Sequence, residues 1–355
     1  MPSEKVNAPV GPPRLLFEPR RRVCWGTNGW GIFLGLQKMI FDFPKKLSRA
    51  GLPVLFVLCL LGGGPPRQGR GESPARERPQ VVATTTVVAD LVREVAGDRV
   101  VIDCLMAAGI DPHSYRATPR DADRLARADL IVASGLHLEG KLAELLSRLG
   151  KRVPVVAVAD TLPPDRLLEV APGLFDPHVW FDARLWSRCP AAVAEALEKI
   201  DPAGTADYQR RSADYAARLE KLDEELRLRI ATIPAEQRVL VTAHDAFRYF
   251  GKAYGIEVVG VQGTSTESEA GLGDINRLVD LVVDKKIPAI FLETSVSDRS
   301  VTALREGARS RGHDVKLGGR LYSDSLGVAG SGAATLEGAL RENVETIVSA
   351  LCGGR

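Results

Sequence analysis

The sequence contains little cysteine and little histidine, five residues of each in 355. No two cysteines form a Cys-x-x-Cys pair, which excludes a zinc ribbon and a dithiol redox motif. A disulfide between Cys104 and Cys189 stays open, although we expect both to be buried free thiols. The sequence also lacks His-Glu-x-x-His and any evident nucleophile–base pair, so the usual signatures of hydrolases are missing.

A long hydrophobic run is missing from the N-terminal region. The apolar run at residues 52–61 is about half as long as the roughly twenty residues that cross a membrane. Because Lys45, Lys46 and Arg49 precede this run, it indicates a secretory signal, and the Gly-, Pro- and Arg-rich residues that follow indicate a linker. We therefore expect a periplasmic or other extracytoplasmic protein, with the segment at about 45–61 either cleaved or kept as a membrane anchor.

Two details of this leader stay open. Translation from Met39 would give a signal of ordinary length, so either Met1 or Met39 is the start. Cys59 is a candidate for lipidation, but the bulky Leu58 before it makes simple cleavage or retention the favoured interpretation.

The chain has no large excess of charge, since its net charge is +2. Residues 1–78 carry 13 basic and 5 acidic side chains, a net +8, which leaves −6 for the remainder. A mildly acidic folded part argues against a nucleic acid as partner and is compatible with a cationic ligand. The length, together with an apolar content of 45%, is sufficient for two α/β lobes.

Short apolar runs alternate with helical patterns along the rest of the chain. Strand-like runs occur at residues 81–86, 100–105, 130–134, 153–158, 239–241, 258–261, 289–293 and 315–317. They predict an α/β fold of two lobes, each a mainly parallel sheet flanked by helices, joined by one long helix. We expect a leader at residues 1–79, a first lobe at 80–203, the linking helix at 204–233 and a second lobe at 234–355.

One apolar stripe predicts the linking helix. Its residues recur at helical steps: Tyr208, Tyr215, Leu219, Leu222, Leu226, Ile230 and Ile233. Pro234 ends the pattern. A helix from Thr205 to Thr232 would be about 42 Å long at about 1.5 Å per residue, long enough to cross the backs of both lobes. A coiled-coil segment is the alternative.

Two histidines in the first lobe stand in the same tripeptide, Asp-Pro-His. His113 follows the second expected strand, and His178 lies among apolar residues that would shield it from water. Asp111, Asp176 and Asp182 are candidate acceptors for imidazole N–H groups. The alternatives are a solvated loop histidine and acids that only form turns.

Three candidate site residues of the second lobe lie at the ends of strands. His244 stands where an apolar strand gives way to a helical pattern, and the carboxyl edge of an α/β sheet is where ligands bind. Because a helix N-terminus disfavours positive charge, we expect a neutral imidazole, the state that a metal needs. Asp324 follows the last strand and Glu293 ends another, although Asp324 is also explained as a helix or turn cap. His137 follows the third strand and could lie near the same strand ends, although a histidine at the surface or one that supports a ligand is the commoner case. We expect His313 in solvent.

Together these motifs resemble the zinc/manganese solute-binding proteins of ABC importers, the TroA-like family. The similarity covers roughly residues 80–352. It is carried by Asp-Pro-His-Ser-Tyr around His113, Asp-Pro-His-Val-Trp around His178, Thr-Ala-His-Asp-Ala-Phe around His244, Gln-Gly-Thr-Ser-Thr-Glu-Ser-Glu-Ala at 262–270, Phe-Leu-Glu-Thr-Ser at 291–295 and Ser-Asp-Ser-Leu-Gly at 323–327.

The resemblance implies one metal site between the lobes. Its ligands would be His113, His178, His244 and Asp324, supported by Glu293 and Asp182. Some members carry Glu where this chain has its third histidine, and zinc-selective members often carry a long His-rich loop, which is absent here. Manganese therefore stays possible, but three imidazoles and one carboxylate suit tetrahedral Zn²⁺ better than Mn²⁺, which prefers more oxygen.

The resemblance also implies a function. The protein would capture Zn²⁺ or Mn²⁺ as a monomer and deliver the ion to a membrane permease with its ATPase. A metal-binding adhesin or scaffold with the same fold is the alternative. A zinc hydrolase is less favoured because catalytic zinc keeps one coordination position open for water, and four protein ligands would close the shell.

Overall fold

Helices and strands alternate throughout the part of the chain that the structure describes, residues 78–353. The structure is a computed structural model, and the described residues all belong to the compact unit Arg70–Arg355. The expectations about the leader, its start and Cys59 lie outside these residues. Within residues 78–353, no helix is both long and apolar enough to cross a membrane.

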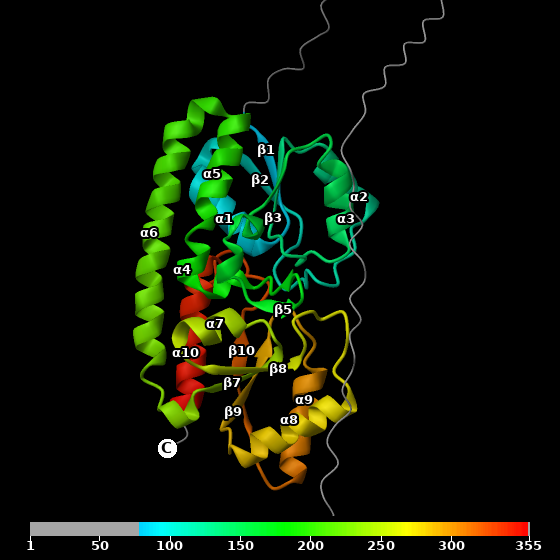
Figure 1. Ribbon diagram of the computed structural model, residues 1–355, viewed down its shortest axis with the longest axis vertical. Coiled ribbons are helices and arrows are strands. Elements are labelled where there is room, and N and C mark those ends of the chain that lie inside the picture. The colour runs from blue at the N-terminus through cyan, green and yellow to red at the C-terminus, as the bar shows by residue number, and fades with distance from the viewer. Residues whose placement is uncertain (1–77, 354–355) are drawn as a thin grey trace, which may run out of the picture. The chain divides into compact units, whose positions relative to one another are not determined.

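The N-terminal half contains a four-stranded parallel sheet in the order β2-β1-β3-β4. Its strands are β1 (Gln80–Ala83), β2 (Val101–Cys104), β3 (Leu130–Ala133) and β4 (Val155–Ala157). Its main helices are α1 (Thr86–Ala96), α2 (Pro119–Ala126), α3 (Leu142–Leu149) and α5 (Cys189–Ile200). Figure 1 shows α1 and α5 on one side of the sheet and α2 and α3 on the other.

The strand period of two explains these layers, since successive side chains point to opposite faces. Val81 and Ala83 of β1 pack in the core that α1 and α5 share, whereas Val82 packs in the core beneath α2 and α3. A short antiparallel pair, β5 (Glu169–Ala171) with β6 (Leu174–Phe175), departs from the parallel pattern.

The C-terminal half holds two parallel strand pairs. They are β7 (Val239–His244) with β8 (Glu257–Gln262), and β9 (Ala289–Glu293) with β10 (Lys316–Leu321), and β7 lies beside β9. The helices are α7 (Arg248–Tyr254), α8 (Leu272–Asp284), α9 (Arg299–Ser310) and α10 (Leu336–Cys352). Val241 of β7 packs with α8 and α9, while Leu240 packs in the core that contains α10.

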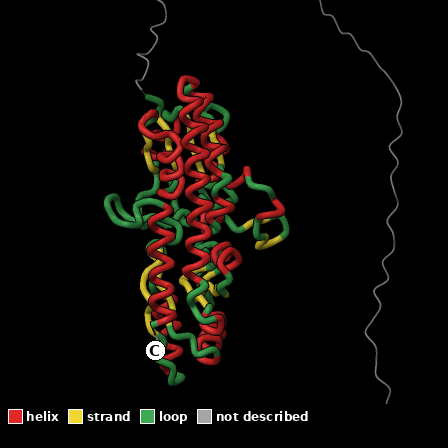
Figure 2. Tube along the Cα trace, turned by 90° about the vertical axis from the view of Figure 1, so that its left-hand side faces the viewer, coloured by secondary structure: helices red, strands yellow, loops and turns green. Residues whose placement is uncertain are grey.

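The long helix α6 (Thr205–Ile230) connects the two halves, as the apolar stripe predicts. It contacts α1 and α5 in the first half and α7 and α10 in the second, and Figures 1 and 2 show it running along both. Every stripe residue from Tyr208 to Ile230 is buried. The helix ends two residues before the predicted Thr232, because Ala231 is already its C-cap. The stripe packs on the chain's own core, so a coiled coil is not needed to explain it.

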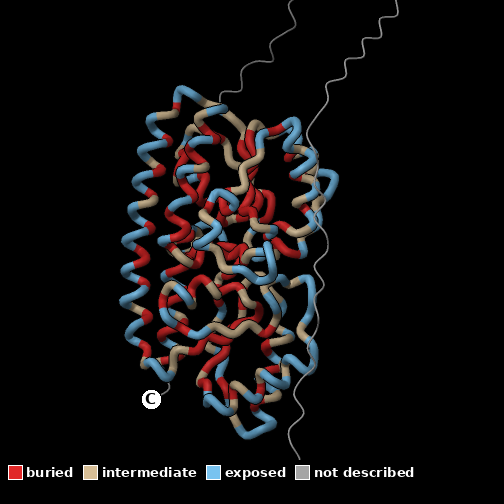
Figure 3. Tube along the Cα trace, in the orientation of Figure 1, coloured by how far each residue is buried: buried red, intermediate tan, exposed pale blue. Residues whose placement is uncertain are grey.

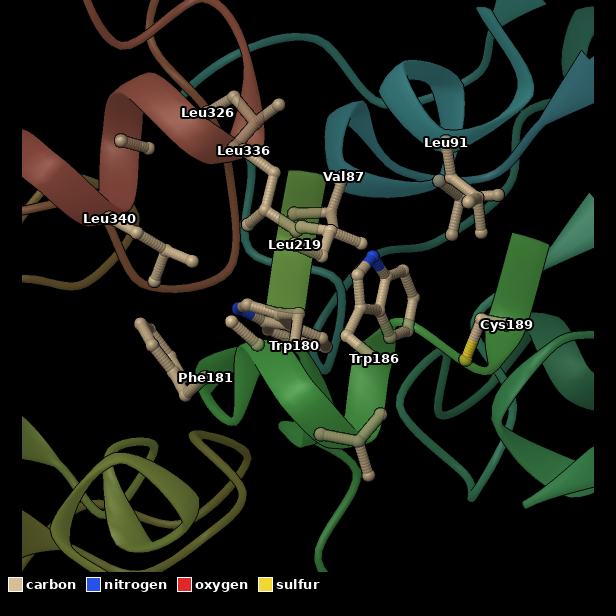
Figure 4. Close-up of a cluster of buried hydrophobic side chains, with 14 of the residues drawn as sticks. Val87, Leu91, Trp180, Phe181, Trp186, Cys189, Leu219, Leu326, Leu336 and Leu340 are labelled. Atoms are coloured by element: carbon tan, nitrogen blue, oxygen red, sulfur yellow. The ribbon is translucent and has the colours of Figure 1, made fainter. Parts of the chain in front are cut away.

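One hydrophobic cluster joins both halves beneath the helices (Figure 4). It includes Val87 and Leu91 from α1, Leu219 from α6, and Leu336 and Leu340 from α10. Burying one such side chain stabilises the fold by roughly 1.5–3 kcal/mol. Figure 3 shows that the buried segments of the chain lie in the interior of both halves, with exposed turns on the outside. The halves therefore form a firm support for side chains at their sheet edges.

The cysteines within residues 78–353 are free thiols. Cys189 is fully buried in the shared core, and Cys104 is half-buried in β2. No disulfide joins the two.

Candidate metal centre

His113 lies in the turn that follows β2. The Oδ1 atom of Asp111 accepts a hydrogen bond from the backbone N–H of His113 at 2.9 Å. An aspartate that binds the backbone two residues further on makes a tight local turn. Pro112 between them restricts φ. This turn holds the His113 ring, only 3% exposed, toward the interior.

His178 uses the same tripeptide in a stronger form. The Oδ1 atom of Asp176 accepts both the backbone N–H of His178 at 3.0 Å and its Nδ1–H at 2.8 Å. The indole of Trp180 packs against the imidazole with ring centroids 5.3 Å apart. Because Nδ1 carries the shared proton, the Nε2 lone pair faces the centre of the site.

His244 is the last residue of β7, and Glu293 is the last residue of the neighbouring β9. The two carboxylate oxygens of Glu293 accept the backbone N–H of His244 at 2.8 Å and its Nδ1–H at 2.6 Å. The prediction that His244 lies at a helix N-terminus is wrong, because α7 begins at Arg248. The ring is oriented by a carboxylate of the adjacent strand and not by a helix dipole.

Asp324 lies in the loop after β10 and is 1% exposed. Its Oδ2 atom accepts a hydrogen bond from the Ser295 hydroxyl at 3.2 Å. Its Oδ1 atom faces Nε2 of His178 at 3.3 Å, yet it has no hydrogen-bond partner within residues 78–353. Two buried lone pairs that face each other repel unless a cation lies between them.

These four side chains converge on one point. The Nε2 atom of His178 lies 3.2 Å from Nε2 of His113 and 3.4 Å from Nε2 of His244. The Oδ2 atom of Asp324 lies 3.5 Å from Nε2 of His244, and one donor atom from each of the four residues lies within 4.8 Å of the others. Four ligands at about 2.0–2.1 Å from a tetrahedral zinc ion would lie about 3.3–3.4 Å apart. The donor distances of 3.2–3.5 Å are close to this spacing, while the bound of 4.8 Å for the whole set is wider, so the four residues could surround one divalent ion.

Burial and charge set the protonation of the site. Burial lowers the pKa of His113 to about 4, so this ring is neutral at physiological pH. Burial also acts to lower the pKa of His178 and of His244, but the carboxylates around them outweigh it and raise both values. For Asp324, burial acts to raise the pKa, and the neighbouring histidines more than compensate, so that its pKa lies well below the ordinary value.

The raised pKa means that the His244 ring holds a proton in the metal-free site. The expected neutral ring therefore applies once a metal ion takes the place of that proton. Three fully or almost fully buried carboxylates, Asp176, Glu293 and Asp324, surround the histidines. With neutral imidazoles the cluster would be strongly negative. A buried negative cluster favours a cation, either as protons on the rings or as a metal ion.

A cleft of about 390 Å³ lies beside this cluster. It is bordered by His113, His137, Lys141, Thr264 and Glu267 among others. Of the four converging residues, only His113 lines it, since His178 and His244 are completely buried. His113 is therefore the member of the four that faces the cleft.

Contacts between loops of the two halves close the edge of this cleft. Lys141 forms an ion pair with Glu267 at 3.4 Å. The hydroxyl of Thr266 donates to Oδ2 of Asp111 at 2.6 Å, next to the turn that carries His113.

The remaining candidates have other positions. Asp182 does not contact an imidazole in the described part of the chain: its Oδ1 caps α4 (Ala183–Trp186) by accepting the N–H of Leu185 at 2.8 Å. Its predicted support of a ligand is therefore wrong. His137 is exposed, which agrees with the surface alternative, and it lines the cleft beside His113. His313 is half-buried, and its Nε2 lies 2.8 Å from the carbonyl oxygen of Ile287, so the expectation of a solvated side chain is wrong.

Sequence reasoning did not single out Ser295, which contacts Asp324. A signal was present in the run Phe-Leu-Glu-Thr-Ser, where Ser295 follows Glu293 by two residues. Because β9 ends at Glu293, Ser295 lies just beyond the same carboxyl edge of the sheet, where α/β folds hold ligands. A polar side chain there is thus a candidate for the same cluster.

Comparison with known proteins agrees with this geometry. A family model described as ZnuA, zinc-uptake complex component A, periplasmic, matches residues 81–350. The zinc-binding protein TroA of Treponema pallidum is 44% identical over 297 residues, which cover 84% of this chain and 96% of that protein. The manganese-binding lipoprotein MntA of Bacillus subtilis is 42% identical over 300 residues, which cover 84% of this chain and 97% of that one.

The fold is similar as well. A solved structure of the periplasmic zinc-binding protein TroA from Treponema pallidum matches with a TM-score of 0.76 and 46% sequence identity. The match covers 77% of this chain and 99% of that chain. The similarity therefore extends over both halves and the long helix between them.

Proposed function

The chain belongs to the family of periplasmic zinc-uptake components A, and we propose that it is the solute-binding protein of an ABC importer for a divalent transition metal. The observation that supports this most is the convergence of three buried imidazoles and one buried carboxylate within 4.8 Å. Such a group of ligands serves capture of an ion rather than packing, because leaving these groups buried without a cation is costly.

The proposed ligands are His113, His178, His244 and Asp324. Zn²⁺ is the favoured cargo, since three imidazoles and one carboxylate suit zinc, and three donor pairs lie 3.2–3.5 Å apart, close to the spacing in a tetrahedral shell. Mn²⁺ remains the second candidate, because relatives more than 40% identical to this chain are named for zinc and for manganese. The family alone therefore does not decide between the two ions.

Capture would take place outside the cytoplasm. The matching family model is described as periplasmic, and relatives are named as lipoproteins, one of them as the substrate-binding lipoprotein of an ABC transporter. These names support an exported protein that passes its ion to a permease with an ATPase. We further propose a monomer with lobes at residues 80–203 and 234–355, joined by the helix at 204–233, and no nucleic-acid partner. The apolar segment at about 45–61 would serve export or anchoring.

A zinc-dependent hydrolase is the less favoured interpretation of the same site. Catalytic zinc keeps a position for water. Here four protein groups surround the centre, and the relatives are named as binding proteins. Nothing in the geometry favours an adhesin or scaffold over transport.

Calorimetric titration with Zn²⁺ and Mn²⁺, after elemental analysis of protein purified without added metal, tests this function. We expect one ion per chain and no turnover of test esters or peptides. The variant His178→Ala should lose more affinity than the roughly 10–100-fold that loss of a supporting contact costs. His313→Gln, which is remote from the site, is the control. Undiminished binding by His178→Ala would contradict the proposed ligand set, and ester turnover would favour a hydrolase.

A further inference from the structure

The turn that carries His113 is anchored to its own half by Tyr115. The hydroxyl of Tyr115 donates to Oδ2 of Asp121 at 2.8 Å. Asp121 lies in the first turn of α2 and also accepts the hydroxyl of Thr118, the residue that caps this helix, at 2.7 Å. The turn is therefore fixed to the N-terminal half two positions beyond His113.

The C-terminal half holds the same turn at two other points. The hydroxyl oxygen of Ser325 accepts the backbone N–H of Gly109 at 2.9 Å. The hydroxyl of Thr266 donates to Oδ2 of Asp111 at 2.6 Å. Ser325 lies in the loop after β10, whereas Thr266 lies between β8 and α8. Two separate loops of one half thus bind a single turn of the other.

Asp111 connects the Thr266 contact to His113. Its Oδ1 atom accepts the backbone N–H of His113 at 2.9 Å. Its Oδ2 atom accepts both the Thr266 hydroxyl and the Ser114 hydroxyl, the latter at 2.8 Å. A hydroxyl that donates to a carboxylate makes a stronger hydrogen bond than one that donates to a neutral acceptor. Thr266 therefore acts on the position of His113 through one intervening side chain.

The neighbouring ion pair between Lys141 and Glu267 is a weaker tie between the halves. Its two side chains are 56% and 45% exposed, and ion pairs in such contact with water contribute little. Thr266 and Asp111 are half-buried, and their contact is shorter. Of the contacts that the segment at 264–267 makes with the other half, the Thr266 hydroxyl is therefore the one with the larger expected effect.

Resting on the proposed function, we propose that Thr266 is a positioning residue that holds the His113 turn against the C-terminal half and so slows release of the bound ion. Because the candidate ligands come from both halves, release requires the ligands of at least one half to leave the ion. The contact between Thr266 and Asp111 opposes that separation without touching the ion. Interactions that form after capture change dissociation rates more than association rates.

Release of Zn²⁺ from the full chain tests this inference. Each protein is loaded with one equivalent of Zn²⁺ and mixed rapidly with an excess of a chelator whose absorbance changes when it binds zinc. The rate of Zn²⁺ uptake is measured in a separate mixing experiment. Thr266→Val replaces the hydroxyl by a methyl group, and Thr266→Ser keeps the hydroxyl. Ser268→Ala is the matched control, since Ser268 is an exposed hydroxyl residue of the same segment.

We expect Thr266→Val to release Zn²⁺ about tenfold faster, the effect of losing one hydrogen bond to a charged group. Its rate of uptake should equal that of the wild type. Thr266→Ser and Ser268→Ala should keep both wild-type rates. In a chain that carries Asp111→Ala, adding Thr266→Val should not change the release rate further, because the acceptor is already absent.

A wild-type release rate in Thr266→Val would overturn the inference. So would an equally large effect of Thr266→Val in the Asp111→Ala chain, because the hydroxyl would then act through some other contact. Should Thr266→Val not fold, as judged by its circular dichroism, an unchanged release rate in Thr266→Ala would overturn the inference instead. A wild-type chain that binds no Zn²⁺ would refute the proposed function itself, a result distinct from release that is insensitive to Thr266.

Discussion

The three converging histidines differ in what orients their rings. His178 and His244 each donate Nδ1–H to a buried carboxylate, Asp176 and Glu293 respectively. Of the two N–H groups of His113, Asp111 accepts the one on the backbone, so it shapes the turn and does not orient the ring. A carboxylate on Nδ1 fixes the tautomer and makes Nε2 a better donor to a metal. His113, whose pKa is lowered to about 4 chiefly by burial, presents a neutral ring at the cleft.

At the scale of single residues, we predict that Glu293→Gln weakens zinc binding by roughly 10–100-fold. The amide keeps one acceptor oxygen but loses the negative charge that orients His244. Competition with a chelator of known affinity measures the loss. Asp182→Asn is the matched control, because this side chain caps α4 and should leave zinc affinity unchanged. Equal affinities for Glu293→Gln and the wild type would show that the contact does not tune the site.

Among the elements, α1 and α10 are joined by one buried acid. Oδ2 of Asp90 on α1 accepts the N–H of Leu336, the first residue of α10, at 2.9 Å. Burial is the main cause that raises the pKa of Asp90 to about 6, opposed by this hydrogen bond and by nearby Arg93. The carboxylates of Glu94 and Glu337 raise the value further. The contribution of this buried acid to the free energy of unfolding therefore depends on pH.

At the scale of elements, we predict a pH-dependent difference between the wild type and Asp90→Asn in urea unfolding of the metal-free protein. Between pH 3.8 and about 6 the folded state binds a proton that the unfolded state releases. Wild-type stability therefore rises, relative to the variant, as pH falls through this window. The full effect is on the order of 3 kcal/mol for a shift of this size. A difference that stays constant from pH 7 to pH 4 would contradict this role of Asp90.

In the molecule as a whole, the candidate ligands come from both halves. His113 and His178 belong to the N-terminal half, and His244 and Asp324 belong to the C-terminal half. The long helix α6 and the shared hydrophobic cluster already connect the halves. A bound ion would add one more link between the halves. It would lie between the carboxyl ends of the strands of the two halves.

For the whole molecule, we predict that zinc raises the melting temperature and that a chelator reverses the change. At a free zinc concentration about one hundred times Kd, binding adds about 2.7 kcal/mol to the free energy of unfolding. Scanning calorimetry with and without zinc would show a rise of several degrees. His178→Ala should show almost none. A zinc-independent melting temperature in the wild type would contradict binding that links the halves.

The sequence by itself determined the features that depend on local pattern. The alternation of apolar runs and helical segments predicted the α/β class, and comparison with solved structures confirmed it. The stripe from Tyr208 to Ile230 predicted α6, because every third or fourth residue of a helix lies on one face. The two Asp-Pro-His tripeptides singled out His113 and His178 by repetition.

Only the tertiary structure decided which polar groups meet. Glu293 is 49 residues from His244 along the chain and Asp182 only four from His178, yet Glu293 binds an imidazole and Asp182 caps a helix. Ser295 reaches Asp324 only because β9 and β10 pair, which brings the segments that follow them side by side. Such contacts depend on strand pairing and register between distant segments, which local composition does not specify.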